Sequence, residues 1–456
     1  KAWRGSVGLD YENNFNDSLQ LTIKGNSVSD HQWYEDFGTN SGITSRPFAE
    51  SLVALSAHSA HWYGELELQH LESLDDRITQ INRPFTQIPR LRIQGRETLV
   101  GKINFSLDSE LTHFNRGLID AVTPTYNTSG SRLYLNPSLT LPLTKSGMYL
   151  TPSLGWHYTR YQLNRSNEDN VSPSLSGTIF SVDTGLIFER LTQSEHHTQT
   201  LEPRLLYAYI PYRDQSQLPT AFDTVIPDLN LVQLFRTNRF VGPDRLGDTH
   251  QISTGITTRL LNNQDGSQYL VGTFGQAFYL KTPCITSLLQ TQCTSQQTAS
   301  KSSDLIGELS LSAYRNININ LGTQWTPEKN HTQRSNLFIQ YRSDNNHIVN
   351  LGYRYDWQTL EQWESSIAWP VNAAWSGYGR VVYSQLDRKF LDHFAGLEYR
   401  SCCFNIRAVV GRAITTRSGE YDTQYKLQLD LKGLSSIGTA DAFLTGGIAG
   451  YSAEHH

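Results

Sequence analysis

Three observations predict an all-β fold for this chain, specifically an antiparallel transmembrane β-barrel of a bacterial outer membrane. Long segments alternate apolar and polar residues with a period of two, as strands do when their two faces meet different surroundings. No apolar run reaches the roughly 18 residues that a membrane-spanning helix needs, and the mean hydropathy is −0.45. The links between the segments alternate between short and long, which is typical of outer-membrane barrels.

The alternating segments are long as well as regular. They run for roughly 9 to 15 residues, whereas strands of globular proteins have a mode of about 5–6 and a tilted membrane strand needs about 9–11. The composition agrees, because 23 Tyr and 9 Trp against one Met suit strands that end at a membrane interface. The apolar faces of four such segments are Met148, Leu150, Pro152, Leu154, Trp156, Tyr158; Leu305, Gly307, Leu309, Leu311; Val349, Leu351, Tyr353, Tyr355; and Tyr421, Thr423, Tyr425, Leu427, Leu429, Leu431.

The links give about 21 strands, if short links are periplasmic turns and long links are outside loops. Only the link Leu191–Thr198 is longer than expected for the side of the membrane on which the alternation places it. The short links are Asn13–Asp17, His58–Ala60, Glu97–Leu99, Thr144–Gly147, Asn262–Gly266, Arg315–Ile317, Asn345–Asn346, Val371–Ala374 and Ser401–Phe404. The long links are Ser27–Arg46, Leu74–Gln87, Arg116–Ser131, Asn164–Val171, Pro211–Arg245 and Thr282–Ser302.

The parity of the strands gives an expectation about the beginning of the chain. If Asn13–Asp17 is periplasmic, Lys1 lies on the outside, although barrels of this class begin and end in the periplasm. We therefore expect an odd number of N-terminal strands to be missing; the alternative is one strand that the pattern does not reveal. Lys1 to Glu12 also lacks the apolar region of a signal peptide.

Two domains follow from the pattern. Residues 1–434 are expected to form the transmembrane barrel, and residues 435–456 a periplasmic C-terminal tail whose ending, Ala453 to His456, resembles the start of a purification tag.

Other classes of function find little support. The net charge of −5 and the absence of a basic stripe with interleaved aromatics disfavour nucleic-acid binding. We find no nucleophile triad, metal-ligand spacing or phosphate-binding loop, so we expect no enzyme, no metal and no cofactor. Clusters such as His393 beside Asp392, His196–His197, and His58 with His61 are interpreted as solvated polar groups. A soluble adhesin remains the weaker alternative to the barrel.

The four cysteines form two groups. Cys284 and Cys293 lie in one outside loop at a spacing that a loop-closing disulfide accommodates. Cys402 and Cys403 are adjacent in a predicted periplasmic turn. A disulfide needs Cα atoms about 4.4–6.8 Å apart, and the apolar band separates the two barrel faces by about 25 Å, so a bond between the groups is excluded. Cys402 and Cys403 are therefore either free thiols or paired with residues outside this chain.

Several stretches resemble the LptD family. One runs from Thr200 to Arg204 and continues through Tyr207, Tyr209 and residues 211–216. Another runs from Leu234 to Phe240, followed by Gly242, Asp244-Arg245, Gly247-Asp248 and residues 254–259. Val28-Ser29-Asp30 with Tyr34, Asp36 and Phe37 also resembles the family, and the most specific element is Arg400-Ser401-Cys402-Cys403 followed by Ile406-Arg407.

The resemblance implies a lipopolysaccharide (LPS) translocon of the outer membrane. It implies a barrel of about 26 strands preceded by a periplasmic jelly roll, with disulfides from Cys402 and Cys403 to cysteines near the N-terminus. Neither the jelly roll nor those cysteines is present here, and the chain aligns from about five strands into such a barrel. The implied partners are LPS, a plug lipoprotein of the LptE type, and a periplasmic LPS bridge protein reached through the jelly roll. The alternative is a general porin or a plugged uptake receptor.

Two sites follow if the family function applies. LPS must leave sideways, and the seam without a covalent hairpin would be bordered here by Tyr421, Asp422, Lys426, Asp430 and Lys432, unless these merely line the lumen. The second site lies in the longest loop, Pro211–Arg245, which carries apolar residues with little reason to face water. We expect part of this loop to fold inward and contact the plug through Leu231 and Phe235; the alternative is a loop packed on itself outside the barrel.

Overall fold

The computed structural model describes residues 3–31, 33, 47–75, 77–79, 82–116, 129–164, 172–192, 196–293, 300–314, 316–343, 347–414 and 419–452. Most residues of the predicted loops Ser27–Arg46, Arg116–Ser131 and Asn164–Val171 lie outside these ranges, as do Asn345–Asn346 and the ending Ala453 to His456.

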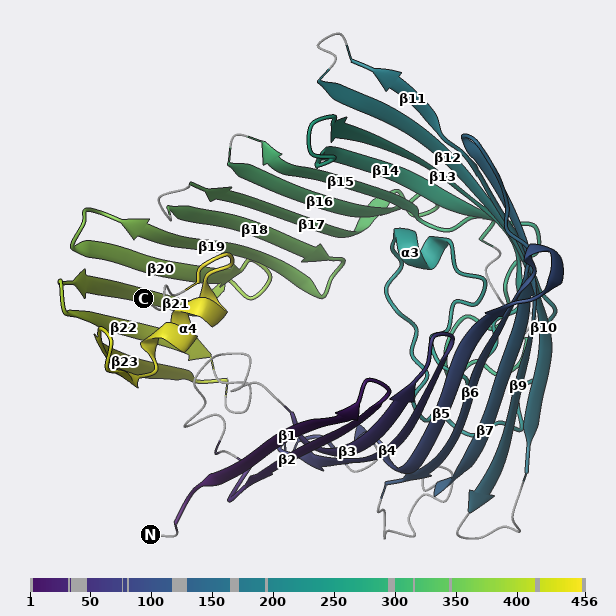
Figure 1. The fold of residues 1–456 in the computed structure, drawn as a ribbon, viewed down its shortest axis with the longest axis horizontal. Helices are drawn as coiled ribbons and strands as arrows, with labels where there is room; N and C mark the ends of the chain where they lie inside the picture. Colours follow the sequence, from purple (N-terminus) through teal and green to yellow (C-terminus); the bar gives the residue numbers. More distant parts are fainter. Residues whose placement is uncertain are drawn as a thin grey trace.

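The fold is one antiparallel sheet that curves around a lumen (Figure 1). No helix among the described residues is long and apolar enough to span a membrane. Consecutive strands pair with each other along the chain. They are β1 (Ser6–Asn16), β2 (Leu19–Val28), β3 (Phe48–His58), β4 (Trp62–Ser73), β5 (Thr86–Thr98), β6 (Asn104–Asn115), β7 (Ser129–Thr140), β8 (Leu143–Lys145), β9 (Met148–Asn164), β10 (Ser174–Leu186), β11 (Phe188–Leu191), β12 (His197–Ile210), β13 (Thr249–Asn262), β14 (Gln268–Tyr279), β15 (Leu305–Tyr314), β16 (Ile317–Thr326), β17 (His331–Arg342), β18 (Ile348–Asp356), β19 (Leu360–Pro370), β20 (Trp375–Ser384), β21 (Lys389–Arg400), β22 (Phe404–Ile414), β23 (Tyr421–Leu431) and β24 (Ser435–Gly438).

The strand number agrees with the prediction. The structure divides the sheet into 24 segments. However, β7 and β8 both pair with β9, and β10 and β11 both pair with β12, so each couple is one interrupted strand. With the short β24 set aside, the described part of the chain contains about 21 spanning strands, most of them in the length range of tilted membrane strands. The predicted antiparallel β-barrel class is confirmed.

The sheet is an open arc in the described part of the chain. β1 pairs with β2, and β23 pairs with β22 and β24, but no pairing joins β1 to β23. The two ends of the arc are visible in Figure 1 as the purple and yellow-green strands on either side of the gap.

The two faces of each strand meet different surroundings, as the period of two predicts. On β23, Leu427 is 67% exposed on the outside, whereas the next residue, Gln428, is buried on the inside. On β21, Leu397 and Tyr399 are exposed on the outside, and Glu398 between them is buried. The outer wall is therefore apolar and suited to lipid, while the inner wall is polar.

The alternation of long and short links does not continue to the end of the chain. After β15, tight turns at residues 327–330, 357–359 and 385–388 stand at the end of the barrel where the long loops were expected. The C-terminal segment, residues 435–452, packs against the inner wall of β18 to β22.

This C-terminal segment folds back from β23. The predicted boundary at residue 434 falls in the turn between β23 and β24. After β24, helix α4 (Ala440–Gly447) lies on the inside of the arc (Figure 1). Leu444 and Ile448 are fully buried against Ile348, Tyr378, Phe394 and Val409 from the inner wall.

A matched pair of substitutions on β15 tests the assignment of faces. Leu309 faces outward near the middle of this strand, and Ser310 faces inward, where its hydroxyl contacts Asn320. We expect Leu309→Arg to lower the free energy of unfolding in lipid vesicles by about 2–4 kcal/mol, because arginine would be placed near the bilayer midplane.

The control is Ser310→Arg, which places the same charge in the lumen and should cost less than about 1 kcal/mol. Urea titration of the refolded variants measures both values. Equal costs for the two variants would contradict the assignment.

Candidate functional site: a loop anchored across the lumen

The longest link of the chain, residues 211–248 between β12 and β13, lies inside the barrel. We call it the luminal loop. Figure 1 shows it within the curve of the sheet, with helix α3 (Leu231–Leu234) close to β14 and β15. The inward position agrees with the expectation from its apolar residues, and the inner wall provides the contacts that keep it there.

Arg132 is the main anchor of the luminal loop on the N-terminal side of the barrel. It lies on β7, faces inward, and its side chain is 0% exposed. The guanidinium donates hydrogen bonds to Glu110 on β6 at 2.6 Å, and to two loop residues, Asp223 at 2.6 and 2.8 Å and Asp244 at 2.7 Å. It also lies over the ring of Phe114, 4.7 Å from its centroid. A charge removed from water in this way needs such partners to be tolerated.

Asp244 organises the loop around this anchor. Its carboxylate accepts a hydrogen bond from the Tyr161 hydroxyl at 2.9 Å and from the backbone N–H groups of Phe222, Asp223 and Thr224 at 2.8 to 3.3 Å. Burial opposes ionisation of this carboxyl, but the charge of Arg132 and these hydrogen bonds outweigh it and lower its pKa to about 2. Asp244 is therefore a charged group around which one turn of the loop folds.

The anchor is the end of a row of charges along the inner wall. Glu67 on β4 lies 3.5 Å from Arg90 on β5, which lies 3.1 Å from Glu110 on β6, which in turn contacts Arg132 on β7. We call these four residues the Arg132 ladder. Because each member neutralises its neighbour across one strand pair, the ladder fixes the side chains that receive the luminal loop.

An apolar cluster surrounds the anchor inside the otherwise polar lumen. The ring of Phe222 from the loop stacks on Phe114 of β6, with centroids 4.4 Å apart. Burying aromatic rings against each other favours the docked position of the loop. The buried members of the cluster are Phe85, Phe114, Tyr161, Leu163, Leu175, Ile210, Leu218, Phe222 and Leu246.

The loop reaches the opposite wall through the α3 region. Asn230 caps α3 by accepting the N–H of Gln233 at 2.9 Å. The N–H of Leu231 donates to Glu308 on β15 at 3.4 Å, and Asp228 forms an ion pair with Arg334 on β17. The luminal loop therefore bridges the lumen from β6 and β7 to β17.

Leu231 and Phe235, the residues predicted to contact a plug, lie close to the wall. The Cδ2 atom of Leu231 would lie 3.5 Å from a Cβ atom added at Gly275 on β14, and the Phe235 ring would lie 2.8 Å from one at Gly255 on β13. The guanidinium of Arg204 lies over the Phe235 ring at 4.2 Å. Gly255 thus makes room for the Phe235 ring, and Leu231 lies at ordinary contact distance from Gly275, whereas Val232 between them is 70% exposed.

A polar cavity of about 750 Å³ separates part of the loop from the N-terminal wall. Arg90, Arg92, Asp108, His157 and Asn238 are among the residues that line it. Its charged and amide groups suit water or sugar hydroxyls better than acyl chains.

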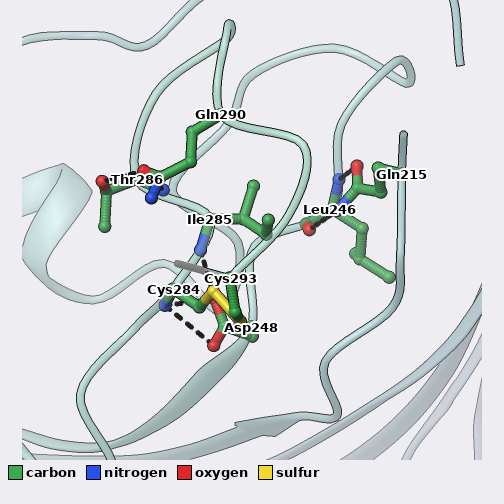
Figure 2. Close-up of a disulfide and its surroundings, with 8 residues drawn as sticks. All are labelled: Gln215, Leu246, Asp248, Cys284, Ile285, Thr286, Gln290 and Cys293. Atoms are coloured by element: carbon green, nitrogen blue, oxygen red, sulfur yellow. Dashed lines mark hydrogen bonds between the residues drawn. A yellow bond between two sulfur atoms is a disulfide. The ribbon is translucent and has the colours of Figure 1, made fainter. Parts of the chain in front are cut away.

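The cysteines occupy the places that the sequence predicts. Cys284 and Cys293 are joined by a disulfide (Figure 2). Cys402 and Cys403 are exposed free thiols in the turn between β21 and β22. A hydrogen bond between the two thiols lowers the pKa of Cys402, which favours its thiolate and hence its reactivity.

The residues predicted to border the seam are only partly brought together. Tyr421, Asp422, Lys426 and Asp430 lie on β23, but Lys432 lies beyond its end, in the turn to β24. β24 pairs with Gln428 to Leu431, so it covers the last third of the edge of β23.

Asp430 belongs to a second buried charge cluster, which period-two reasoning did not single out. Arg407 on β22 lies 2.9 Å from Asp430, 3.4 Å from Glu398 on β21 and 3.7 Å from Asp441 of α4. This cluster fixes the C-terminal segment to the inner wall.

The sequence pattern places Arg132 and Arg407 on the inner wall, because both are charged residues at inward positions of alternating strands. It contained no signal for their partners, which come from distant parts of the chain. Among the described residues, no group of three or more His, Cys, Asp or Glu side chains is placed to hold a metal ion. His61 contacts Glu97 at 3.4 Å on the surface, consistent with a solvated pair.

Comparison with known proteins matches the chain to one family. The family model for LptD, LPS transport system D, matches residues 3–375. The LPS-assembly protein LptD of Thiobacillus denitrificans is 34% identical over 96% of this chain and 58% of its own length. That of Xanthomonas euvesicatoria pv. vesicatoria is 31% identical over 98% of this chain and 60% of its own length. This chain therefore spans somewhat more than half the length of these relatives.

Among solved structures, the copper transporter OprC matches with a TM-score of 0.41 and 10% identity, covering 95% of this chain and 72% of that protein. A similarity at this level supports no conclusion about function.

Substitution of Arg132 tests whether it anchors the luminal loop. We expect Arg132→Met to destabilise the docked loop by about 3–5 kcal/mol, because the loop carboxylates Asp223 and Asp244 are left without their buried counter-charge. Hydrogen–deuterium exchange at the amides of residues 222–224, which donate to Asp244, measures the loss.

Arg334→Met is the matched control, because its side chain is partly exposed and such pairs contribute about 1 kcal/mol or less. It should leave these amides protected. If Arg132→Met also leaves them protected, the anchor is elsewhere.

Proposed function

This chain belongs to the LptD family, and we propose on that premise that the protein transports LPS across the outer membrane and releases it sideways into the outer leaflet. The match of the LptD family model to residues 3–375 carries the proposal. It also favours LPS transport over the porin and uptake-receptor alternatives.

The chemistry of the two walls supports this function. LPS has a charged sugar head and apolar acyl chains, so a protein that moves it must offer a polar route beside an apolar one. The inner wall carries inward charges such as the Arg132 ladder, and the outer wall carries exposed side chains such as Leu427 and Leu397. A molecule of this kind can pass from one environment to the other only where the wall opens.

We place the opening at the free edge of β23. Hydrogen bonds hold every other long strand to two neighbours among the described residues, except β1 at the opposite end of the arc. Along β23, β24 covers Gln428 to Leu431, and within the described ranges no strand lies beside Tyr421 to Leu427 on that side. No hairpin turn joins the two strands that meet at this seam. Separating them therefore needs less free energy than separating two strands that a hairpin connects.

Photo-crosslinking at β23 tests the position of the opening. The full-length protein, with its partner lipoprotein, carries a photo-reactive phenylalanine analogue in place of Leu427 and receives LPS in vesicles. We expect LPS adducts at this position, because acyl chains leaving the seam pass the outer face of β23.

The control carries the same analogue in place of Leu201 on β12, which faces outward on the opposite side of the arc. Adducts of equal yield at both positions would indicate bulk lipid contact and reject the seam as the exit.

The luminal loop is proposed to contact the plug lipoprotein. A barrel wide enough for LPS leaves an aqueous channel unless something fills it, since barrels of about 16–18 strands already do so. The loop bridges the lumen and presents Val232, Val225 and Ile226 as exposed apolar side chains. Leu231 and Phe235 lie in the same loop but are partly buried, and both contact glycines of the wall.

A photo-crosslinker in place of Val232 is therefore expected to capture the lipoprotein, with lower yields in place of Leu231 and Phe235. Val381 on the outer wall is the matched control for residue type. Capture at Val232 no higher than at Val381 would argue against a contact between the loop and the plug.

Cys402 and Cys403 are proposed to pair with cysteines in the part of the protein that precedes this chain, as the family resemblance implies. Their exposed position in one turn makes both thiols accessible to such partners. Non-reducing peptide mapping of the full-length protein from an oxidising compartment should find each of them in a mixed peptide. Recovery of both as free thiols would contradict the pairing, and the Cys284–Cys293 peptide serves as the internal control.

The same resemblance implies a jelly roll before the barrel and a periplasmic bridge protein that delivers LPS to it. We keep both as part of the proposed function.

A further inference from the structure

The segment that contains the disulfide lies directly on the luminal loop. It follows β14 and covers residues 280–293, and we call it the outer lid. It has no strand or helix of its own, and Ser, Thr and Gln are frequent in it. Such a segment has little intrinsic preference for one shape, so the 9-residue separation of Cys284 and Cys293 bridged by the disulfide is its main internal constraint.

Asp248 makes the central contact between the two segments. It is the last residue of the luminal loop before β13, and it is buried. Its carboxylate accepts hydrogen bonds from the backbone N–H of Cys284 at 2.8 and 2.9 Å and from that of Ile285 at 2.8 Å (Figure 2). Both donors belong to the disulfide-bonded end of the lid, so the disulfide restrains the backbone that presents them to Asp248.

Two further contacts extend along the loop. The Arg245 guanidinium donates to the carbonyl of Leu288 in the lid at 3.3 Å and to that of Pro219 in the loop at 2.7 Å. The N–H of Gln215 donates to the carbonyl of Thr291 at 3.1 Å, while the Gln215 side chain donates to the carbonyl of Leu246 at 2.7 Å (Figure 2).

An apolar core joins the lid and the loop. Cys284 and Ile285 from the lid are buried with Phe240 from the loop, and Tyr212 and Leu288 pack against them. Together with the polar contacts, this core means that the lid adds to the interactions that hold the loop in its position.

We infer that the outer lid, held in shape by the Cys284–Cys293 disulfide, positions the luminal loop through Asp248, and that the two segments together form a barrier to small hydrophilic solutes at the outer end of the lumen. The inference rests on the proposed function in one respect, namely that the barrel stands in an outer membrane. It assigns a sealing role to the lid and a positioning role to Asp248.

The experiment uses the full-length protein with its partner lipoprotein in vesicles. Two variants release the lid in different ways: Cys284→Ser with Cys293→Ser removes the covalent constraint, and Asp248→Asn removes the charge that binds the two N–H groups. Each has a matched control, Leu289→Ser on the exposed part of the lid, and Asp265→Asn in the turn between β13 and β14. A difference in gel mobility between unboiled and boiled samples, equal to that of the wild type, verifies that every variant forms a barrel.

Two readouts follow the loop and the barrier separately. The first is tryptic cleavage after Arg245, whose side chain is 2% exposed in the intact site. The second is the flux of a small sugar across the vesicles. We expect both to rise about tenfold or more in each lid variant, since hydrogen bonds to charged groups contribute about that factor, and to stay at the wild-type level in the controls.

Cleavage and flux at the wild-type level in either lid variant would overturn the inference. LPS insertion is measured in the same vesicles. A wild-type protein that seals the vesicles but inserts no LPS would count against the proposed function and leave the lid assignment standing. Lid variants with unchanged flux and normal LPS insertion would reject the lid assignment and leave the proposed function standing.

Discussion

The buried guanidinium of Arg132 is the constraint on which the arrangement of the lumen depends. A charge on an inner wall is ordinarily solvated, but this one is fully buried and surrounded by Glu110, Asp223 and Asp244. Removing it from water costs several kcal/mol, and the cost is offset only if the luminal loop brings both of its carboxylates to the same place. Asp244 in turn binds three backbone N–H groups of the loop. One pairing therefore fixes the position of the loop and its local conformation.

Charge pairing across neighbouring strands recurs along the inner wall. Besides the Arg132 ladder, a second series runs from Arg354 on β18 through Glu364 and Arg380 to Asp392 on β21, with separations of 3.3, 2.9 and 2.6 Å. Because these residues alternate in sign from strand to strand, the wall is polar without a large field of one sign. Such a wall presents paired charges and no array of unpaired cations among these residues.

Two internal segments cover different parts of the wall. The luminal loop occupies the region from β6 to β17, and the C-terminal segment with α4 occupies the region from β17 to β23, where Gln340, Arg407 and Gln428 hold it. Each is fixed by a buried charge and an apolar cluster. The edge of β23 from Tyr421 to Leu427 is left free by both.

The sequence by itself determined the strands, their faces and the class of fold, because a period of two is a local property that lipid on one side and water on the other impose on every strand. It also placed Cys284 with Cys293, whose separation of nine residues limits the possible geometry. Only the tertiary structure decided which charges meet. Arg132 and Asp244 are 112 residues apart, and no periodicity links them. The same holds for Phe235: its apolar character indicated burial, but Gly255 on the facing strand decided that its ring packs against the wall, while Val232 of the same loop is exposed. Such contacts depend on how the sheet curves, and its curvature arises from all the strands together.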